Sequence, residues 1–321
     1  MPTLSRPRFG SLQFYPRKRA SKILPSVNWS TLSNIKSDSP TVLGFIAYKA
    51  AMATAIVKDS TDKSMTLGKK IAIPVTILEV PNMKIFSVRF YKNSNVLREI
   101  IVSNDKELKR KLKVPKQVKN LDNLPNDYDD IRLIVYSISK QTAIKKTPDL
   151  IELAISGDNN SKLNFAKSFL NKEITLSDFL NAKFDLLDIR GLTKGKGLSG
   201  PVKRFGITLK GHKSEKGVRR PGSLGPWHPA HVTFRTPIAG QLGMFTRIHY
   251  NNNLISSGNI KDRNINSDTG FKHYGKIKSS YIVIKGSVQG PVKRQVLLTP
   301  SFRPTKSTKK KKYEFIELIT R

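Results

Sequence analysis

The sequence predicts an α+β protein that is mainly β, in which a β-barrel carries an inserted α/β module. Residues 71–81 (IAIPVTILEVP) and 83–91 (MKIFSVRFY) are rich in β-branched and aromatic residues, and only a turn at Pro81-Asn82 separates them. Strands that follow one another with so little helix between them favour a barrel over a doubly wound sheet. With 38% hydrophobic residues, the chain is able to build one core and a smaller second one.

Other segments of the same character extend the predicted β-structure. Residues 42–57 are the most membrane-like stretch, but they are shorter than the ~20 residues of a membrane span and contain Lys49, so a core strand is expected. Pro74 indicates an edge position or a bulge in the strand over 71–81. Further strands are expected at residues 131–138, 184–189, 281–285 and 295–299, with a short element at 313–319.

Residues 93–189 differ from the rest of the chain in charge. They hold 14 of the 23 acidic residues and 16 Lys and Arg, so their net charge is near +2, whereas the whole chain carries +35. Three helices are expected here: near residues 105–113, after Thr147-Pro148, where Pro takes the first helical position, and from Ser161 onward. This block is predicted to be an α/β insertion that engages a polyanion less than the remainder does.

The excess of basic residues indicates a polyanionic partner. The chain has 58 Lys and Arg against 23 Asp and Glu and a pI near 10.3. Self-repulsion of this size destabilises a compact state unless counter-charge comes from outside, and a nucleic acid supplies it.

The absence of cysteine excludes disulfides, cysteine nucleophiles and thiolate metal sites and is consistent with a reducing compartment. Residues 1–10 lack the apolar segment of a secretory signal.

Residues 191–250 concentrate this charge. They contain 11 Lys and Arg and 11 Gly but a single acidic residue, Glu215, and no apolar run long enough for a core. Low hydrophobicity with high net charge leaves the chain entropy unopposed in water, so we expect a partner to order this segment. Its aromatic residues and histidines follow a non-repeating pattern, which indicates a specific partner, and RNA is expected.

An N-terminal arm is expected to bind the same partner. Residues 6–20 (RPRFGSLQFYPRKRA) alternate cations with Phe9, Phe14 and Tyr15 and show neither a helical nor a strand period. Cations contact phosphates, whereas aromatic rings stack on bases or pack on the protein. The alternative is a frayed terminus.

The motif Gly-x-Gly-x-x-Gly at residues 195–200 follows a predicted strand, as it does in dinucleotide-binding sites. Pro201 and the run 202–209 predict no helix behind it, and no acidic residue follows at the required spacing. We therefore expect these glycines to let the backbone approach phosphates closely.

The pentapeptide Gly-Pro-Val-Lys-Arg at residues 200–204 recurs at 290–294. The recurrence is either a repeated turn that presents two cations or a chance similarity.

Four histidines suggest a metal or catalytic site at first sight: His212, His228, His231 and His249. The pattern does not support either, because Pro229 interrupts the central pair and only Glu215 is available as a nearby carboxylate. No catalytic and no metal-binding residue is therefore expected. Trp227 is either a buried anchor or the exposed tip of a loop that enters RNA, and exposure is favoured because its neighbours offer nothing to bury it against.

Six motifs occur along the chain in a fixed order: PRFGSLQFYPRKRA at 7–20, YKAAM at 48–52, VTILEVP at 75–81, TKGKGLSGPVKRFGI at 193–207, RRPGSLGPWHPAHVTF at 219–234 and AGQLGMFTRIHYN at 239–251. Together they resemble ribosomal protein L-three of the large subunit, in the branch shared by archaea and eukaryotes. Residue 51 is Ala where most members of that family have Gly. The long C-terminal extension of eukaryotic members is absent, so an archaeal source is expected.

The resemblance implies a six-stranded barrel of the translation-protein type with an inserted α/β domain, an N-terminal arm and a long central basic loop. It implies that the arm and the loop penetrate the large-subunit rRNA, and that the loop tip with Trp227 approaches the peptidyl-transferase centre. The expected division is 1–40 for the N-terminal rRNA-binding arm, 41–92 for the first part of the barrel, 93–183 for the inserted α/β domain, 184–190 for a return strand, 191–258 for the central basic loop and 259–321 for barrel completion and a solvated basic tail.

Twenty residues, mostly cations, are expected to contact RNA: Arg6, Arg8, Arg17, Lys18, Arg19, Lys194, Lys196, Lys203, Arg204, Lys213, Arg219, Arg220, Trp227, His228, His231, Arg235, Gln241, Arg247, Lys293 and Arg294. The glycines expected to permit close approach are Gly195, Gly197, Gly200, Gly222 and Gly225. No cofactor is expected, since structural magnesium ions would be held by the rRNA.

The expected function is that of a non-catalytic component of the large ribosomal subunit in the cytoplasm, which binds 23S-type rRNA and supports early assembly. Neighbouring large-subunit proteins are expected partners, and tRNA and elongation factors only indirect ones; no membrane and no small-molecule substrate are expected.

Two alternative functions stay open. A DNA architectural protein would show a groove-reading helix or repeated boxes, and an RNA-modifying enzyme on a barrel would show carboxylates or histidines clustered on the β-core.

Overall fold

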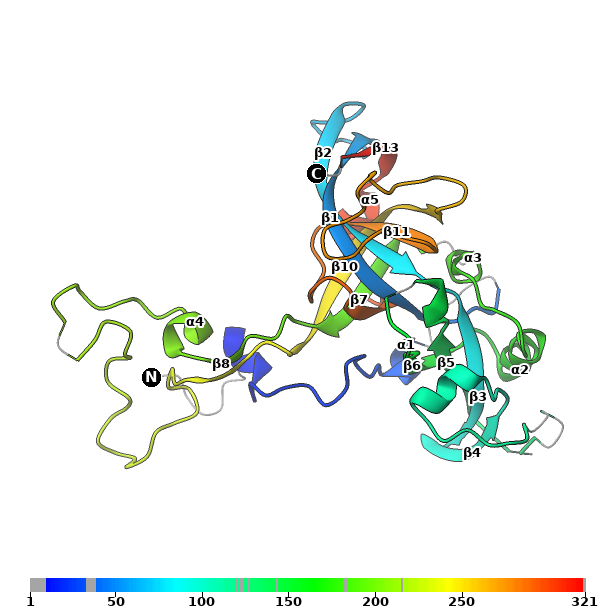
Figure 1. The fold of residues 1–321 in the computed structure, drawn as a ribbon, viewed down its shortest axis with the longest axis horizontal. Helices are drawn as coiled ribbons and strands as arrows, with labels where there is room; N and C mark the ends of the chain where they lie inside the picture. Colours follow the sequence, from blue (N-terminus) through cyan, green and yellow to red (C-terminus); the bar gives the residue numbers. More distant parts are fainter. Residues whose placement is uncertain are drawn as a thin grey trace. The chain divides into compact units, whose positions relative to one another are not determined.

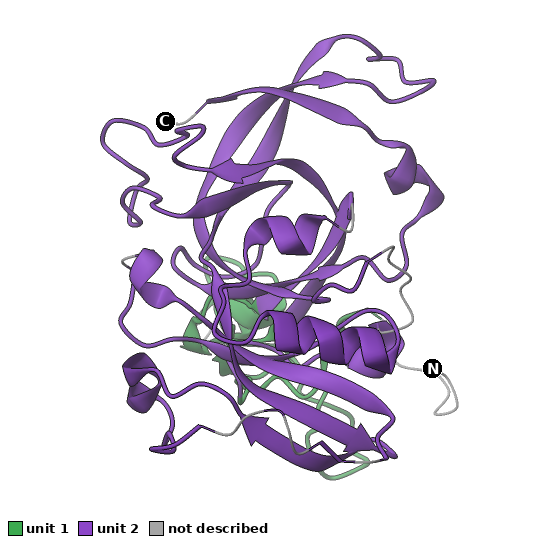
Figure 2. Cartoon of the chain, turned by 90° about the vertical axis from the view of Figure 1, so that its right-hand side faces the viewer, with its two compact units in different colours: residues 1–21, 192–246 green, residues 22–191, 247–321 purple. Residues whose placement is uncertain are grey.

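The computed structural model describes residues 10–319, apart from 33–38, 119–120, 122–123, 126, 143, 182–183 and 215. The chain forms two compact units (Figure 2). Unit 1 combines Met1–Ser21 with Leu192–Thr246, and unit 2 combines Lys22–Gly191 with Arg247–Arg321. In the described part of the chain, no helix is both long and apolar enough to cross a membrane.

Unit 2 is built on a sheet that closes on itself. Within the described residues, the strand order is β12-β7-β10-β11-β2-β1-β13, and an additional pairing of β12 with β1 joins six of these strands into a ring (Figure 1). The strands are β1 (Phe45–Asp59), β2 (Lys70–Val80), β7 (Leu186–Leu192), β10 (Thr246–Asn259), β11 (Ser280–Lys285), β12 (Gln295–Pro300) and β13 (Tyr313–Ile319).

The long strand β1 makes the ring possible because it changes partner along its length. Its first part, from Phe45 to Tyr48, pairs with β12, and its last part, from Thr54 to Asp59, pairs with β13. The register against β2 shifts between Lys49 and Ala51, as in a β-bulge, which bends and twists a strand. Apolar side chains of several ring strands, among them Val57, Val75 and Val283, then form one of the cores.

A second sheet, in the order β4-β3-β5-β6, forms the rest of unit 2 together with short helices. Its strands are β3 (Met83–Lys92), β4 (Asn95–Ile101), β5 (Asp130–Ser137) and β6 (Leu150–Ala154). The helices between residues 29 and 180 are α1 (Trp29–Leu32), η2 (Lys106–Arg110), η3 (Ser139–Gln141), α2 (Asn159–Ser168) and α3 (Leu176–Leu180), and α5 (Lys306–Lys310) lies between β12 and β13. A continuous core joins both sheets, since Phe45 of β1, Leu133 of β5 and Phe179 of α3 belong to the same buried cluster.

The expected strands are present, but their grouping differs from the prediction in one place. Strand β3 was expected in the first part of the barrel, up to residue 92, yet it pairs with β4 and β5 of the second sheet. The turn after β2 does not fold β3 back onto β2, because Met83 exchanges backbone hydrogen bonds with Ile174 (3.0 and 2.7 Å) and aligns with Ser137. Long-range pairing therefore decides the sheet to which β3 belongs.

Two of the three expected helices need correction. The segment after Thr147-Pro148 is strand β6 rather than a helix, because it pairs with β5 from Arg132 to Tyr136 and buries Leu153. The segment near residues 105–113 contains the 3-10 helix η2 instead of an α-helix. The helix expected from Ser161 is confirmed as α2. Helix α3 was missed, although Thr175 and Asp178 form a capping box at its start.

The arm and the central loop are shorter than expected. Residues Lys22 onward belong to unit 2, where helix α1 buries Trp29 and Leu32, so this part of the expected arm contributes to the core. At the other boundary, residues 246–258 are not loop but strand β10, which pairs with β11 from Leu254 to Asn259. The physical reason is the same in both cases: apolar side chains in these segments reach buried positions.

Candidate nucleic-acid interface

The two ends of the basic loop run antiparallel in unit 1. Strand β8 (Gly197–Ser199) pairs with β9 (Gly240–Leu242), and Thr193 N donates to Phe245 O at 3.0 Å. At Gly243 the two segments are so close that an added Cβ would lie 2.0 Å from Lys194 O, and φ is +80°. Only glycine fits this position without a backbone shift.

The glycines expected to permit close approach occupy different surroundings. A Cβ at Gly195 would lie 3.1 Å from Met244 Cγ, whereas one at Gly197, Gly200, Gly222 or Gly225 would meet nothing within 4 Å. These four positions are open toward the outside, and their approach to phosphates stays a prediction. Gly243 was missed because its neighbours Leu242 and Met244 carry no turn signal.

A short helix, α4 (Pro201–Phe205), follows the glycine-rich motif, so the expectation that no helix starts here is wrong. Pro201 occupies the first turn, and Gly206 ends the helix in the left-handed conformation, with φ of +70°. The second Gly-Pro-Val-Lys-Arg copy is not helical, and its Gly290 has φ of +94°. The two copies therefore do not share one turn, and the repeated-turn interpretation is wrong.

Two of the expected RNA contacts use their donors inside the protein. Arg204 donates from Nε to Gln241 O (3.1 Å) and from Nη1 to Ile238 O (2.9 Å), which connects α4 to the returning end of the loop. Arg17 of the arm donates from Nη1 to Arg204 O (2.9 Å), and its Cζ lies 4.1 Å from the centre of the Phe205 ring. Gln241 is occupied in a similar way, since its side-chain amide donates to the carbonyls at 242 and 243.

The arm packs on the loop within unit 1. Ala20 N donates to Met244 O (2.9 Å), and the rings of Tyr15 and Phe234 meet edge to face at 5.2 Å between centroids. Arm residues 10–14 form the 3-10 helix η1 (Gly10–Phe14). The described part of the arm is therefore a folded component of the loop, not a frayed terminus.

The remaining residues expected to contact RNA fall into an exposed and a half-buried group. Twelve charged or potentially charged side chains are exposed: Lys18, Arg19, Lys194, Lys196, Lys203, Lys213, Arg219, Arg220, His228, His231, Arg235 and Lys293. Arg247 and Arg294 are half-buried in unit 2, and Arg6 and Arg8 lie outside the described residues. Trp227 is 88% exposed, as expected for a loop tip rather than a buried anchor, and it lines a hollow with Leu224 to Val232.

The distribution of ion pairs gives unit 1 its electrostatic character. Every ion pair among the described residues joins side chains of unit 2, for example Arg132 to Glu152 at 3.3 Å and Lys162 to Asp130 at 2.7 Å. Within the described chain, no three acidic, histidine or cysteine side chains come close enough to hold a metal ion. The exposed cations of unit 1 are thus available to external phosphates.

The chain is thus a β-rich protein with a separate, cation-rich unit of exposed Lys, Arg and aromatic side chains, an arrangement typical of nucleic-acid-binding proteins. The family described as Ribosomal protein L3 matches residues 1–114 and 101–319 of this chain, which therefore belongs to that family.

Archaeal relatives extend over almost the whole chain. Large ribosomal subunit protein uL3 of Methanocaldococcus jannaschii is 39% identical over 317 residues, which cover 94% of this chain and 92% of that protein. The proteins of the same name from Archaeoglobus fulgidus and Methanococcus vannielii are each 38% identical, and each match covers 94% of this chain and 93% and 92% of those proteins. The expected resemblance to archaeal members is confirmed.

Proposed function

We propose that this chain is a structural component of the large ribosomal subunit and binds its rRNA through unit 1. The observation that carries the proposal is the exposed cation set of unit 1, which has no ion-pair partner among the described residues. The family is one of ribosomal proteins rather than enzymes. The two alternatives lose support, because no described helix of unit 1 exceeds five residues and the buried carboxylates of the ring strands, Asp59, Glu79 and Asp188, accept hydrogen bonds within unit 2.

Several finer features belong to the same proposal. The ring of unit 2 would be the six-stranded barrel of the translation-protein type, and the second sheet its inserted α/β domain. The tip with Trp227 would approach the peptidyl-transferase centre, so that tRNA and elongation factors are affected only indirectly. Assembly would occur early, in the cytoplasm, beside neighbouring large-subunit proteins. Magnesium ions would be held by the rRNA, not by this chain.

The physical basis of binding is counterion release. Each cation that neutralises a phosphate makes the affinity for RNA fall with salt, by a slope of roughly 0.7 to 0.9 per contact. The exposed Trp227 ring adds stacking, which contributes about 1–3 kcal/mol per base. The folded base of unit 1, held by Arg17 and Arg204, limits the entropy lost when the tip becomes ordered on RNA.

The test is sedimentation of the tagged full chain from cell lysate on a sucrose gradient, followed by sequencing of the RNA crosslinked to it. Migration with large subunits and crosslinks to large-subunit rRNA support the proposal. Migration in light fractions, or crosslinks to DNA or to assorted RNAs, would overturn it.

A further inference from the structure

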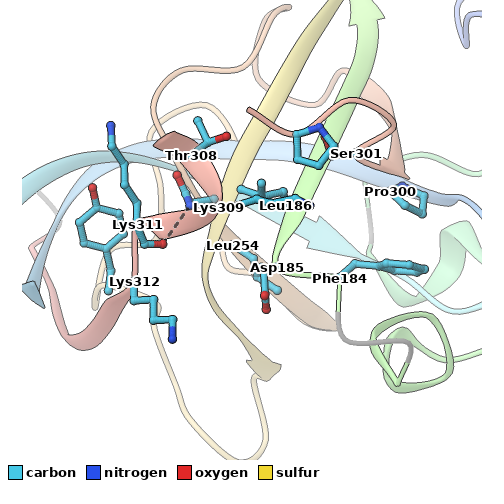
Figure 3. Close-up of a pocket in the computed structure, with 13 residues that line it drawn as sticks. Phe184, Asp185, Leu186, Leu254, Pro300, Ser301, Thr308, Lys309, Lys311 and Lys312 are labelled. Carbon is cyan, nitrogen blue, oxygen red and sulfur yellow. Dashed lines mark hydrogen bonds between the residues drawn. The ribbon is translucent and has the colours of Figure 1, made fainter. Parts of the chain in front are cut away.

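A pocket of unit 2 lies beside the basic C-terminal segment, and none of the residues expected to bind RNA belongs to its lining. Its volume is about 640 Å³, within the range of sites that hold a small ligand group. Figure 3 shows Lys309 of helix α5 (Lys306–Lys310), with Lys311 and Lys312 after it, toward one end of the pocket, and Phe184, which precedes β7, at the other.

The backbone of the segment that forms this pocket is fastened to the ring, whereas its lysine side chains are exposed, as expected for a solvated cation run. Thr305 caps helix α5 by accepting from Thr308 N at 3.3 Å. Lys312 exchanges hydrogen bonds with the β1–β2 hairpin, because its N donates to Thr61 Oγ1 (3.1 Å) and its O accepts from Ser60 N (3.0 Å). Earlier in the segment, Ser301 N donates to Leu186 O at 3.1 Å.

The charges around the pocket are unbalanced. Lys309, Lys311 and Lys312 line it, and all three are exposed. Among the described residues, none of the ion pairs involves these lysines. A single carboxylate, Asp185, lies in the lining opposite them. Three lysines of one short segment, none of them in an ion pair of the described residues, favour a phosphate at this end of the pocket.

The remaining walls suit a flat, partly apolar group. Tyr313 lines the pocket, and Lys285 fixes its ring by donating from Nζ to the phenol oxygen at 2.6 Å with the ammonium 4.3 Å from the ring centre. Phe184 lies in the lining opposite and packs on Phe179, with 5.7 Å between ring centroids. Aromatic walls of this kind receive unstacked bases, and Asp185 offers an acceptor to a ribose hydroxyl or a base amino group.

We propose that this pocket binds one unstacked nucleotide of an RNA chain, with Lys309, Lys311 and Lys312 on its phosphate and Tyr313 and Phe184 beside its base. The proposal rests on the proposed function, since it assumes that the chain binds RNA. It adds a second contact in unit 2 that is independent of the loop.

The test compares two double variants of the full chain that lose the same charge from the same segment. Lys309→Ala with Lys312→Ala removes lining lysines, whereas Lys306→Ala with Lys310→Ala removes lysines of α5 outside the lining. We expect the first double variant to bind a single-stranded RNA oligonucleotide about tenfold more weakly than the second at equal salt. In the wild type, 4-thiouridine in the RNA should crosslink to peptides that contain Tyr313 or Phe184.

Equal affinities of the two double variants, with crosslinks confined to unit 1, would overturn the pocket while leaving the proposed function intact. Failure of the proposed function is distinguishable, because the wild-type chain would then bind the oligonucleotide no more tightly than it binds DNA of the same length. The third measurement is the affinity of the wild type and of both double variants for adenosine monophosphate. Binding of this free nucleotide as tightly as the oligonucleotide, with the same loss in the lining variant, would show a free-nucleotide site and overturn the proposal for RNA.

Discussion

Arg17 and Arg204 lie against the same aromatic ring, with their guanidinium carbons 4.1 and 5.2 Å from the centre of Phe205, and Arg17 also donates to Arg204 O at 2.9 Å. Two segments 187 residues apart in sequence are thereby joined within unit 1. Both arginines were expected on RNA from their basic surroundings. Both also hold the arm on the base of the loop, and their contact with RNA stays a prediction.

Replacing Arg17 should therefore release the arm. Arg17→Ala removes the hydrogen bond and the stacking on Phe205, so we expect amide protection at Ala20 to fall by about five- to tenfold, the equivalent of about 1–1.4 kcal/mol. The control is Lys18→Ala, since Lys18 is exposed and its loss removes the same charge. Equal protection at Ala20 in both variants, measured by hydrogen exchange, would contradict this role.

Gly243 should tolerate no side chain. A Cβ there would lie 2.0 Å from Lys194 O at φ of +80°, so Gly243→Ala has to separate the two ends of the loop or distort them. We expect the free energy of opening the β8–β9 pair to fall by at least ~1–2 kcal/mol, measured by hydrogen exchange at Lys196 and Phe245. Gly222→Ala is the matched control, because its Cβ would meet nothing within 4 Å. The prediction fails if the two alanines have the same effect.

Asp59 should make the β1–β2 hairpin sensitive to acid. Hydrogen bonds from Thr61, Thr66 and Ser64 lower the pKa of the Asp59 carboxyl well below its ordinary 3.8. A carboxyl with a depressed folded pKa stabilises the fold fully above pH 3.8, and this contribution is lost as the pH falls from 3.8 through the folded pKa.

Asp59→Asn should remove that dependence. We expect the corrected amide protection of Thr61 to decline between pH 5 and pH 2 in the wild type and to be lower and nearly flat in the variant. Asp62→Asn serves as the control because Asp62 lies in the same hairpin outside this hydrogen-bonded group. A wild-type profile as flat as that of Asp59→Asn would rule out the proposed linkage.

The two tryptophans of the chain should respond in opposite ways. Trp227 is 88% exposed and Trp29 is 3% exposed. Trp227→Ala should weaken RNA binding by about 1–3 kcal/mol and leave the unfolding midpoint unchanged. Trp29→Ala should lower the free energy of unfolding by ~3–5 kcal/mol. A shifted midpoint for Trp227→Ala, or unchanged RNA affinity, would contradict the assignment of the tip to RNA.

Sequence patterns predicted what local chemistry determines. The strands β1, β2, β11 and β12 follow runs of β-branched residues, and the exposure of Trp227 follows from neighbours that offer it no apolar partner. Such patterns did not predict which strands pair when they are far apart in the sequence. The start of β6 resembles a helix start at Pro148, and only its alignment with β5 makes it a strand.

The RNA-binding residues, too, could be predicted from the sequence only in part. An arginine has the same sequence signal whether it meets phosphate or a backbone carbonyl, so Arg17 and Arg204 could not be separated from Lys18 and Lys203 without the fold. The lysines after Thr305 resemble a disordered tail in composition. Their role in lining a pocket depends on the hydrogen bonds of Lys312 to the β1–β2 hairpin.

We propose that unit 1 carries the main contact of this chain with large-subunit rRNA. The most direct measurement is mass spectrometry of peptides crosslinked to RNA by ultraviolet light in purified large subunits that contain the chain. We predict that most crosslinks fall in residues 10–21 and 192–246, with Trp227 among them. Crosslinks concentrated in the nearly neutral block 93–189, with none in the loop, would contradict this proposal.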